Sequence, residues 1–175
     1  MDNWPPPDIF PSRRKPHRLP RCEYGKLYHP VFFAACTRDR QPILLSPGLP
    51  DLIRRLLDEN AARHGCDLIA CCLMPDHIHV LACVTQEHGD VLSFFEGFKN
   101  GVANAALRMG RGRLWQRNFW DRHTRNDLDL RRCVQYIVHN PVEEGLCERP
   151  EDWRYTLVRE YPWRRAGAAN DREGA

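Results

Sequence analysis

Apolar residues along the chain recur with two different spacings, and these spacings predict where helices and strands lie. Apolar residues three and four positions apart indicate amphipathic helices, whereas short apolar runs bounded by glycine or proline indicate strands. Two of the apolar runs are joined by Met74-Pro75-Asp76, which predicts a β-hairpin. The predicted strands cover 27–37, 66–73, 77–84 and 114–124, and the predicted helices cover 47–64, 91–109 and 127 to about 140.

The order of these elements is strand, helix, strand, strand, helix, strand, helix. It predicts an α+β fold, an antiparallel sheet with helices packed on one face. Asn126 can cap the last helix, with Asp129 completing a capping-box-like start. Pro141 predicts where regular helix stops. Beyond the last helix, Trp153 and Tyr155 predict a packed extension.

The length of 175 residues suits one domain with a segment at each end. We expect a basic, proline-rich arm at 1–26, the domain at 27–145, and an extension with a polar tail at 146–175. Neither a membrane span nor a signal peptide is predicted, so we expect a cytoplasmic protein without a membrane partner. The eight cysteines form no C-x-x-C pair, which predicts buried thiols rather than zinc ligands or disulfides.

The segment His77-Ile78-His79 is a candidate metal site. Side chains of a strand alternate between faces, so both imidazoles point the same way and can hold a divalent ion. The alternative is two surface histidines on a solvated sheet face. Leu81 stands where a histidine-triad hydrolase would carry a third histidine, and the motifs of zinc deaminases and HExxH proteases are absent. A two-histidine site with a third ligand from elsewhere in the chain remains.

The last predicted helix offers such a ligand together with a nucleophile. Tyr136 lies roughly 130° from the centre of the predicted core stripe, and Asn140 follows one turn later on the same flank. This placement suits a tyrosine that forms a covalent bond to phosphate beside a metal-binding amide. An exposed tyrosine beside a capping asparagine is the alternative. The predicted core stripe consists of Leu130, Cys133, Val134, Ile137 and Val138.

Three segments together resemble the REP-associated tyrosine transposases, which belong to the single-tyrosine HUH transposases of bacterial insertion sequences. The opening of the chain, with Arg18-Leu19-Pro20, Tyr24 and Tyr28, is also similar, and the similarity runs from about residue 18 to 158. The specific feature is the combination of H-x-H after Met-Pro with Tyr-x-x-x-Asn-Pro. The three segments are Met74–His79, Trp115–Asp121 and Tyr136–Val142.

This resemblance implies a ferredoxin-like, RRM-like HUH fold and a set of roles. Tyr136 would be the nucleophile, His77 and His79 the metal ligands, and Asn140 would replace the glutamine that related transposases often carry. The implied substrate is single-stranded DNA with hairpins, cleaved through a 5′-phosphotyrosine. Phosphate oxygens favour Mg²⁺ or Mn²⁺ as the ion. The REP-associated enzymes are expected to act as monomers, whereas insertion-sequence relatives form homodimers.

The net charge of +3 conceals two basic segments. Residues 13–26 hold six basic and one acidic residue, and residues 108–132 hold eight and three, so the rest of the chain carries −7. Guanidinium groups suit phosphate contacts. Aromatic residues lie between the arginines of the second segment and could stack on unpaired bases, but we expect Trp115 and Phe119 to be core residues instead. The predicted DNA-binding residues are Arg18, Arg108, Arg111, Arg113, Arg117, Arg122, Arg125 and Arg132.

Two other classes of function compete with the transposase. One is a module on the same fold that binds structured nucleic acid without cutting it, which would need none of His77, His79 and Tyr136. The other is a metal-dependent phosphohydrolase of small molecules, which would leave Tyr136 and the arginine-rich segment without a role.

Overall fold

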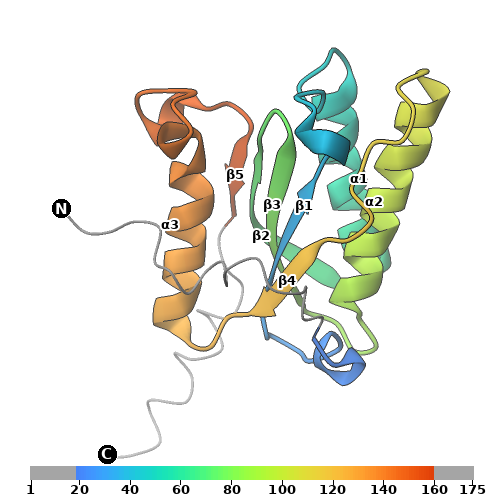
Figure 1. The fold of residues 1–175 in the computed structure, drawn as a ribbon. Helices are drawn as coiled ribbons and strands as arrows, with labels where there is room; N and C mark the ends of the chain where they lie inside the picture. The colour runs from blue at the N-terminus through green and yellow to red at the C-terminus, as the bar shows by residue number, and fades with distance from the viewer. Residues whose placement is uncertain (1–18, 160–175) are drawn as a thin grey trace, which may run out of the picture.

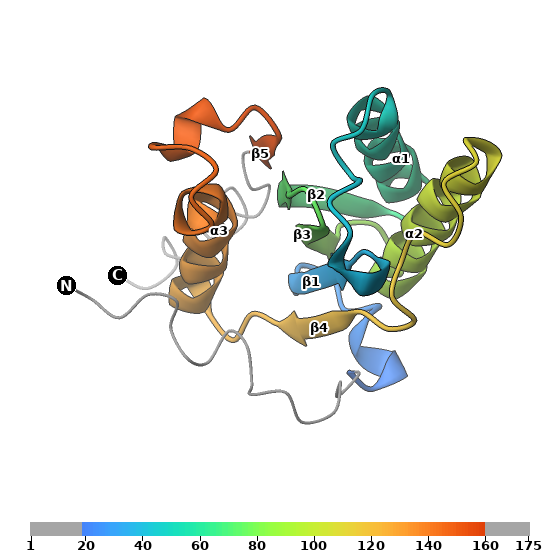
Figure 2. The same ribbon diagram turned by 45° about the horizontal axis from the view of Figure 1, so that its top comes forward.

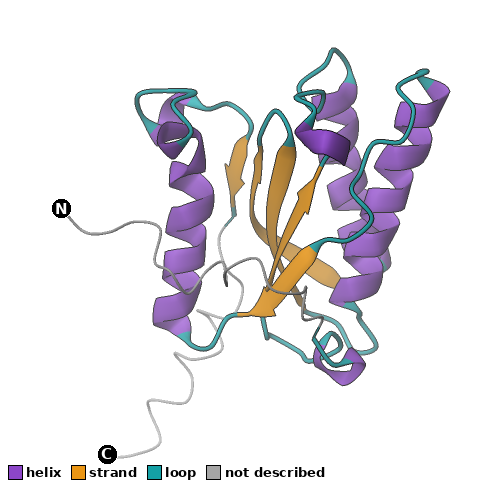
Figure 3. Cartoon of the chain, in the orientation of Figure 1, coloured by secondary structure: helices purple, strands orange, loops and turns teal. Residues whose placement is uncertain are grey.

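A computed structural model describes residues 19–159 of the protein. Figures 1 and 3 show the arrangement of its helices and strands. The strands are β1 (Val31–Cys36), β2 (Cys66–Leu73), β3 (His77–Val84), β4 (Trp120–His123) and β5 (Thr156–Val158). The α-helices are α1 (Leu49–Arg63), α2 (Val91–Arg108) and α3 (Asp127–Glu143), and the short 3-10 helices are η1 (Arg21–Glu23), η2 (Arg38–Arg40) and η3 (Pro150–Asp152). The strand order is β4-β1-β3-β2-β5, and all neighbours are antiparallel.

The two faces of the sheet are covered by different helices (Figure 2). Along β1, Phe33 belongs to the cluster buried with α1 and α2, whereas Phe32 belongs to the cluster buried with α3. This alternation follows from the period of two along a strand. The α+β antiparallel fold is therefore confirmed. The expectation that all helices share one face is wrong for α3, because the central strands are apolar on both faces and each face needs a cover.

The hairpin and the start of α3 follow the sequence pattern closely. Strands β2 and β3 begin and end at the predicted residues. The Asn126 side chain caps α3, accepting the backbone N–H of Asp129 at 2.9 Å. The predicted return bond of a capping box is replaced, because the Asp129 carboxylate accepts from the Arg125 backbone N–H and from the Arg122 guanidinium instead.

Helix α3 continues through Pro141 to Glu143, so the predicted end near Asn140 is wrong. A proline inside a helix removes its own N–H donor, but this loss falls in the last turn. The following backbone N–H groups still find partners, since Glu144 donates to the Asn140 carbonyl at 3.0 Å and Leu146 donates to the Pro141 carbonyl at 2.8 Å.

The predicted strand at 114–124 is also wrong over most of its length, because β4 begins only at Trp120. The preceding segment packs on the side of α2 instead. There the Trp115 indole N–H donates to the Lys99 carbonyl at 3.0 Å. Trp115 and Phe119 are both buried, which confirms that they are core residues.

The folded unit extends beyond residues 27–145 at both ends. Tyr24 is buried and its hydroxyl donates to Asp121 Oδ2 at 2.6 Å. After α3, the Trp153 indole N–H donates to the Leu73 carbonyl at 3.0 Å, and β5, which the sequence did not predict, pairs with β2. Residues 153–158 of the expected extension therefore pack against the sheet. The remainder of the arm, with Arg18, and the tail from residue 160 lie outside the described residues.

All eight cysteines have free thiols. Burial raises the pKa of Cys66, Cys71 and Cys83 to about 12, so these thiols are unreactive core residues, as predicted. The prediction of burial is wrong for Cys22, which is exposed, and for Cys36 and Cys147, which are half-buried.

No helix between residues 19 and 159 is both long and apolar enough to cross a membrane.

Candidate active site between strand β3 and helix α3

Strand β3 presents two histidines on the sheet face that α3 covers. His77 and His79 alternate with Ile78, which packs into the cluster on the side of α1 and α2. The two imidazole centroids are 4.8 Å apart, and the residues are only 6% and 2% exposed. The prediction that both rings share one face is confirmed, and they lie under a helix rather than on a solvated surface.

Helix α3 turns its tyrosine toward this histidine pair. The predicted stripe placed Tyr136 on the flank of the helix, which is wrong, because Tyr136 is only 5% exposed. The helix is rotated so that Tyr136 and Asn140 join the buried face while Val138 is half-buried. The buried residues of α3 are Cys133, Tyr136, Ile137, Asn140 and Pro141.

Aromatic contacts hold the Tyr136 ring beside the histidines. Its centroid lies 5.1 Å from that of His79, with the planes at 70°, and 6.0 Å from that of Phe32. Phe32 also lies 5.5 Å from His79. The His79–Tyr136 contact is edge-to-face, whereas both contacts of Phe32 are tilted. Aromatic packing of these kinds is favourable and helps to fix ring orientation. The phenol and the histidine pair, far apart in sequence, therefore form one cluster.

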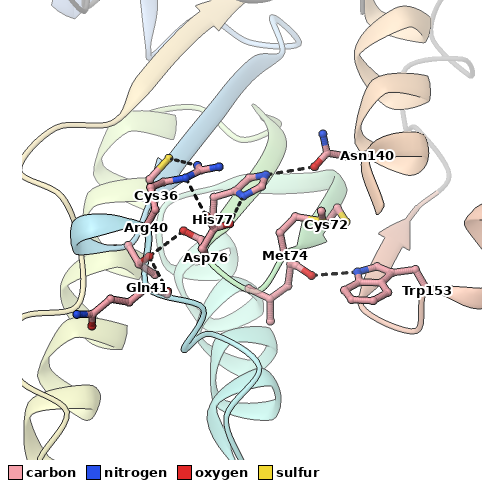
Figure 4. A network of polar contacts seen from close by, with 11 residues as sticks. Cys36, Arg40, Gln41, Cys72, Met74, Asp76, His77, Asn140 and Trp153 are labelled. Atoms are coloured by element: carbon pink, nitrogen blue, oxygen red, sulfur yellow. Dashed lines mark hydrogen bonds and ion pairs between the residues drawn. The ribbon is translucent and has the colours of Figure 1, made fainter. Parts of the chain in front are cut away.

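A chain of polar contacts orients His77 (Figure 4). Asp76 Oδ1 lies 2.6 Å from His77 Nδ1, and Asn140 Oδ1 lies 3.1 Å from His77 Nε2. A carboxylate next to Nδ1 favours the proton on that nitrogen, which leaves the lone pair of Nε2 directed toward α3. On its other side, Asp76 Oδ2 pairs with Arg40 Nε at 2.8 Å.

The residues at this point fit a divalent metal ion. With Nδ1 protonated, His77 Nε2 and Asn140 Oδ1 are two acceptors 3.1 Å apart, about the distance between adjacent ligands that each lie ~2.1 Å from one octahedral ion. His79 adds a second imidazole. Between residues 19 and 159 no three His, Cys, Asp or Glu side chains gather as a metal site. The Asn140 amide, whose Oδ1 lies 3.1 Å from His77 Nε2, is the candidate third ligand on α3.

Burial keeps the second histidine neutral. Burial, and after it the neighbouring His77, holds the pKa of His79 well below its usual value. A neutral imidazole is the form that binds a metal. His79 is therefore ready as a ligand at neutral pH without having to lose a proton.

Tyr136, the candidate nucleophile, is by contrast not in its reactive protonation state. Burial raises the pKa of Tyr136, and the carboxylates of Glu143 and Glu144 raise it further, whereas Asn140 and Arg40 lower it. The phenol is therefore protonated at neutral pH. Additional positive charge at the site would favour the phenolate that a nucleophile requires.

Two residues of this network were missed in the sequence. Asp76 was interpreted as part of the hairpin turn and of the Met74–His79 segment but was given no role at the site, although a carboxylate next to a metal-binding histidine is a common orienting partner. Arg40 lies in the polar segment after β1, and nothing in the local pattern connects it with the histidine strand. By contrast, His139, the neighbour of Asn140, is exposed and its Nδ1 contacts the Gln135 carbonyl, so it does not face the histidine pair.

Apart from Arg18, which lies outside the described residues, the predicted DNA-binding arginines are distributed over both sides of the sheet. Arg122 is occupied inside the protein, since its guanidinium forms two bonds to Asp129, at 2.7 and 2.9 Å, and its side chain is 16% exposed. The others lie at or after the end of α2, or next to and on α3. The exposed ones among them are Arg108, Arg113, Arg117, Arg125 and Arg132, while Arg111 is half-buried.

Comparison with known proteins now identifies the class. Residues 23–140 match the family described as Transposase IS200 like, so the chain belongs to the IS200-like transposase family. A relative from Haemophilus influenzae, classed with the REP-associated tyrosine transposases, is 27% identical over 143 residues, or 75% of this chain and 79% of that protein. The REP-associated tyrosine transposase of Escherichia coli is 26% identical over 125 residues, or 71% of this chain and 73% of that protein.

The fold agrees with this assignment. A solved structure described as a REP-associated tyrosine transposase bound to a REP hairpin superposes with a TM-score of 0.69 at 23% identity. The match covers 90% of this chain and 87% of that chain. The resemblance inferred from the sequence is confirmed, and the protein is an enzyme of the tyrosine transposase class.

Proposed function

We propose that this transposase cleaves and rejoins single-stranded DNA next to a REP-like hairpin, with Tyr136 as nucleophile. The observation that carries the proposal is the convergence of α3 on the histidine strand. Tyr136 packs 5.1 Å from His79, and Asn140 lies 3.1 Å from His77. A site for binding alone needs neither a buried tyrosine nor a pair of metal-competent histidines. The names of the two relatives support a REP hairpin as the DNA.

In the proposed cleavage step, Tyr136 Oη attacks phosphorus as the bond from phosphorus to the 3′ oxygen breaks. The phenolic proton passes to solvent, and the departing oxygen takes a proton from solvent to become a 3′-hydroxyl. The products are a 5′-phosphotyrosine and a free 3′ end. Because the phosphodiester is conserved in the covalent bond, a later 3′-hydroxyl reverses the step and joins strands without ATP.

His77, His79 and Asn140 would hold Mg²⁺ or Mn²⁺. Such an ion, when bound, acts as a Lewis acid on a nonbridging phosphate oxygen and neutralises developing charge. The protein prepares this site through two features already described: Asp76 fixes the His77 tautomer, and burial keeps His79 neutral. All four side chains come from one chain, so a monomer would suffice for the chemistry.

The direct test is incubation with labelled single-stranded hairpin DNA and Mn²⁺, followed by denaturation. We expect a covalent protein–DNA adduct that Tyr136→Phe abolishes while hairpin binding is kept. Tyr155→Phe, a half-buried tyrosine near β5, is the matched control and should form the adduct normally. Adduct formation by Tyr136→Phe would refute the nucleophile, and binding without any adduct in the unchanged protein would favour a non-cleaving module.

A further inference from the structure

Arg40 reaches the proposed active site from an unusual backbone position. It ends η2, the short turn that directly follows β1. Asp39 and Arg40 both have positive φ, 54° and 55°. Two successive non-glycine residues in the left-handed region are uncommon and disfavoured, and such backbone is concentrated at functional sites. Here it brings the Arg40 side chain back to the residue that precedes His77.

Two side chains anchor the guanidinium in that place. Its Nε pairs with Asp76 Oδ2 at 2.8 Å, and its Nη1 donates to Cys36 Sγ at 3.0 Å. Cys36 is the cross-strand partner of His77 in the sheet. Figure 4 shows the Arg40 guanidinium joined to Cys36 by this contact. Arg40 is therefore held at the edge of the histidine pair.

The anchored arginine still has donors to offer. Its side chain is 50% exposed, and its contacts within residues 19–159 engage Nε and Nη1 but not Nη2. Its positive charge lowers the pKa of both His79 and Tyr136. Arg122 makes the contrast clear, because its two terminal nitrogens are occupied by Asp129 and its side chain is only 16% exposed.

We propose that Arg40 binds a nonbridging oxygen of the phosphate that Tyr136 attacks, an inference that rests on the function proposed above. Attack by the phenol adds negative charge to the phosphate oxygens, and a guanidinium presents planar, permanently charged donors to them. The carboxylates of Glu143 and Glu144 have the opposite effect to Arg40 on the phenol, because they raise its pKa whereas Arg40 lowers it. A fixed cation at this edge offsets their charge without the entropy loss of ordering a free side chain.

The competing explanation is that Arg40 only supports Asp76, which in turn positions His77. In that case the loss of Arg40 should resemble the loss of the Asp76 charge and weaken the metal site. Contact with the phosphate instead predicts a slower chemical step at saturating metal. Dependence on Mn²⁺ therefore separates the two roles.

The experiment measures single-turnover adduct formation at saturating hairpin DNA over a range of Mn²⁺ concentrations. We expect Arg40→Ala to be slower by about 10²- to 10³-fold at saturating Mn²⁺, with an unchanged half-saturating Mn²⁺ concentration, and Arg40→Lys to recover part of the rate. Arg38→Ala, in the same turn and paired among the described residues only with Asp39, is the control and should keep the full rate. A normal rate for Arg40→Ala, or a loss that added Mn²⁺ removes, would overturn the proposal.

A second measurement uses binding alone, in the Tyr136→Phe background, with DNA that contains the mapped cleavage site. Each phosphate contact to a single strand contributes about 0.7 to the slope of log K against log salt, so Arg40→Ala should lower that slope by about 0.7. A neutral methylphosphonate at the attacked position should give the same decrease, and combining both changes should add nothing further. Additive decreases would place Arg40 on a different phosphate and overturn the proposal.

These outcomes also distinguish this inference from the function on which it rests. If the unchanged protein forms no adduct, the proposed function fails and the role of Arg40 fails with it. If the unchanged protein forms the adduct and Arg40→Ala forms it equally fast, only the inference about Arg40 fails.

Discussion

Asp76 gives the sharpest test of the proposed metal site, because its carboxylate contacts the rear nitrogen of a ligand histidine. Oδ1 lies 2.6 Å from His77 Nδ1, and Oδ2 pairs with Arg40. In Asp76→Asn the amide oxygen can still accept a hydrogen bond from the His77 Nδ1–H, but the negative charge is lost. In Asp76→Ala the acceptor is lost as well. The two variants therefore separate the effect of the charge from that of the bond.

The magnitude follows from the kind of hydrogen bond. Bonds to charged groups contribute about 1.5–3 kcal/mol and neutral ones about 0.5–1.5 kcal/mol, so Asp76→Asn should cost about 1–1.5 kcal/mol of metal-binding free energy. One tenfold change in affinity corresponds to about 1.4 kcal/mol, so we expect about a tenfold weaker Mn²⁺ affinity. Loss of the whole partner in Asp76→Ala should approach about 100-fold, the upper range for removal of such orienting groups.

The assay should measure Mn²⁺ binding directly, by electron paramagnetic resonance of the free ion, alongside the Mn²⁺ dependence of adduct formation. Asp67→Asn is the matched control, since Asp67 is a half-buried aspartate at the far end of the same hairpin. Wild-type Mn²⁺ affinity in Asp76→Ala would refute the role of Asp76 in orienting His77.

Three further predictions concern stability. Burial, and after it His77, lowers the pKa of His79 in the folded protein. In the unfolded chain this histidine takes up a proton near pH ~6.5, whereas in the folded protein it does not. The stability of the metal-free protein should therefore decline as the pH falls below about 6.5, and His79→Gln should reduce that decline in melting temperature; identical pH profiles would contradict this. Arg122→Ala should lower the free energy of unfolding in urea by about 1–3 kcal/mol, because the 18%-exposed Asp129 carboxylate loses both of its hydrogen bonds from the guanidinium. In the control, Arg132→Ala, an exposed arginine is removed and the free energy of unfolding should change by less than about 0.5 kcal/mol. Gly97→Ala in α2 should destabilise the protein despite the better helix propensity of alanine, because its Cβ would lie 2.6 Å from Asn60 Oδ1 in α1; a stabilised variant in the same urea titration would show that Asn60 can move aside.

Local pattern alone determined much of the architecture. The hairpin was predicted to the residue because its two apolar runs are bounded by Gly65 and by the turn at Pro75, and because a period of two leaves only one way to place His77 and His79 relative to Ile78. The bounds of α1 and α2 were predicted to within two residues from their apolar spacing. The three motifs that carried the resemblance to the tyrosine transposases are likewise local in sequence.

The tertiary structure decided which face of each element meets which partner. At 100° per residue, Cys133 and Ile137 lie at equal angles from Val134 on one side and from Tyr136 on the other, so the sequence allows a buried stripe through either residue. Packing of the Tyr136 ring against Phe32 and His79 selects the stripe through Tyr136. The placement of α3 opposite α1 and α2 was decided in the same way, because sequence periodicity marks a buried face but not what covers it. Arg40 reaches Asp76 only through the pairing of β1 with β3, a long-range contact that no local spacing encodes.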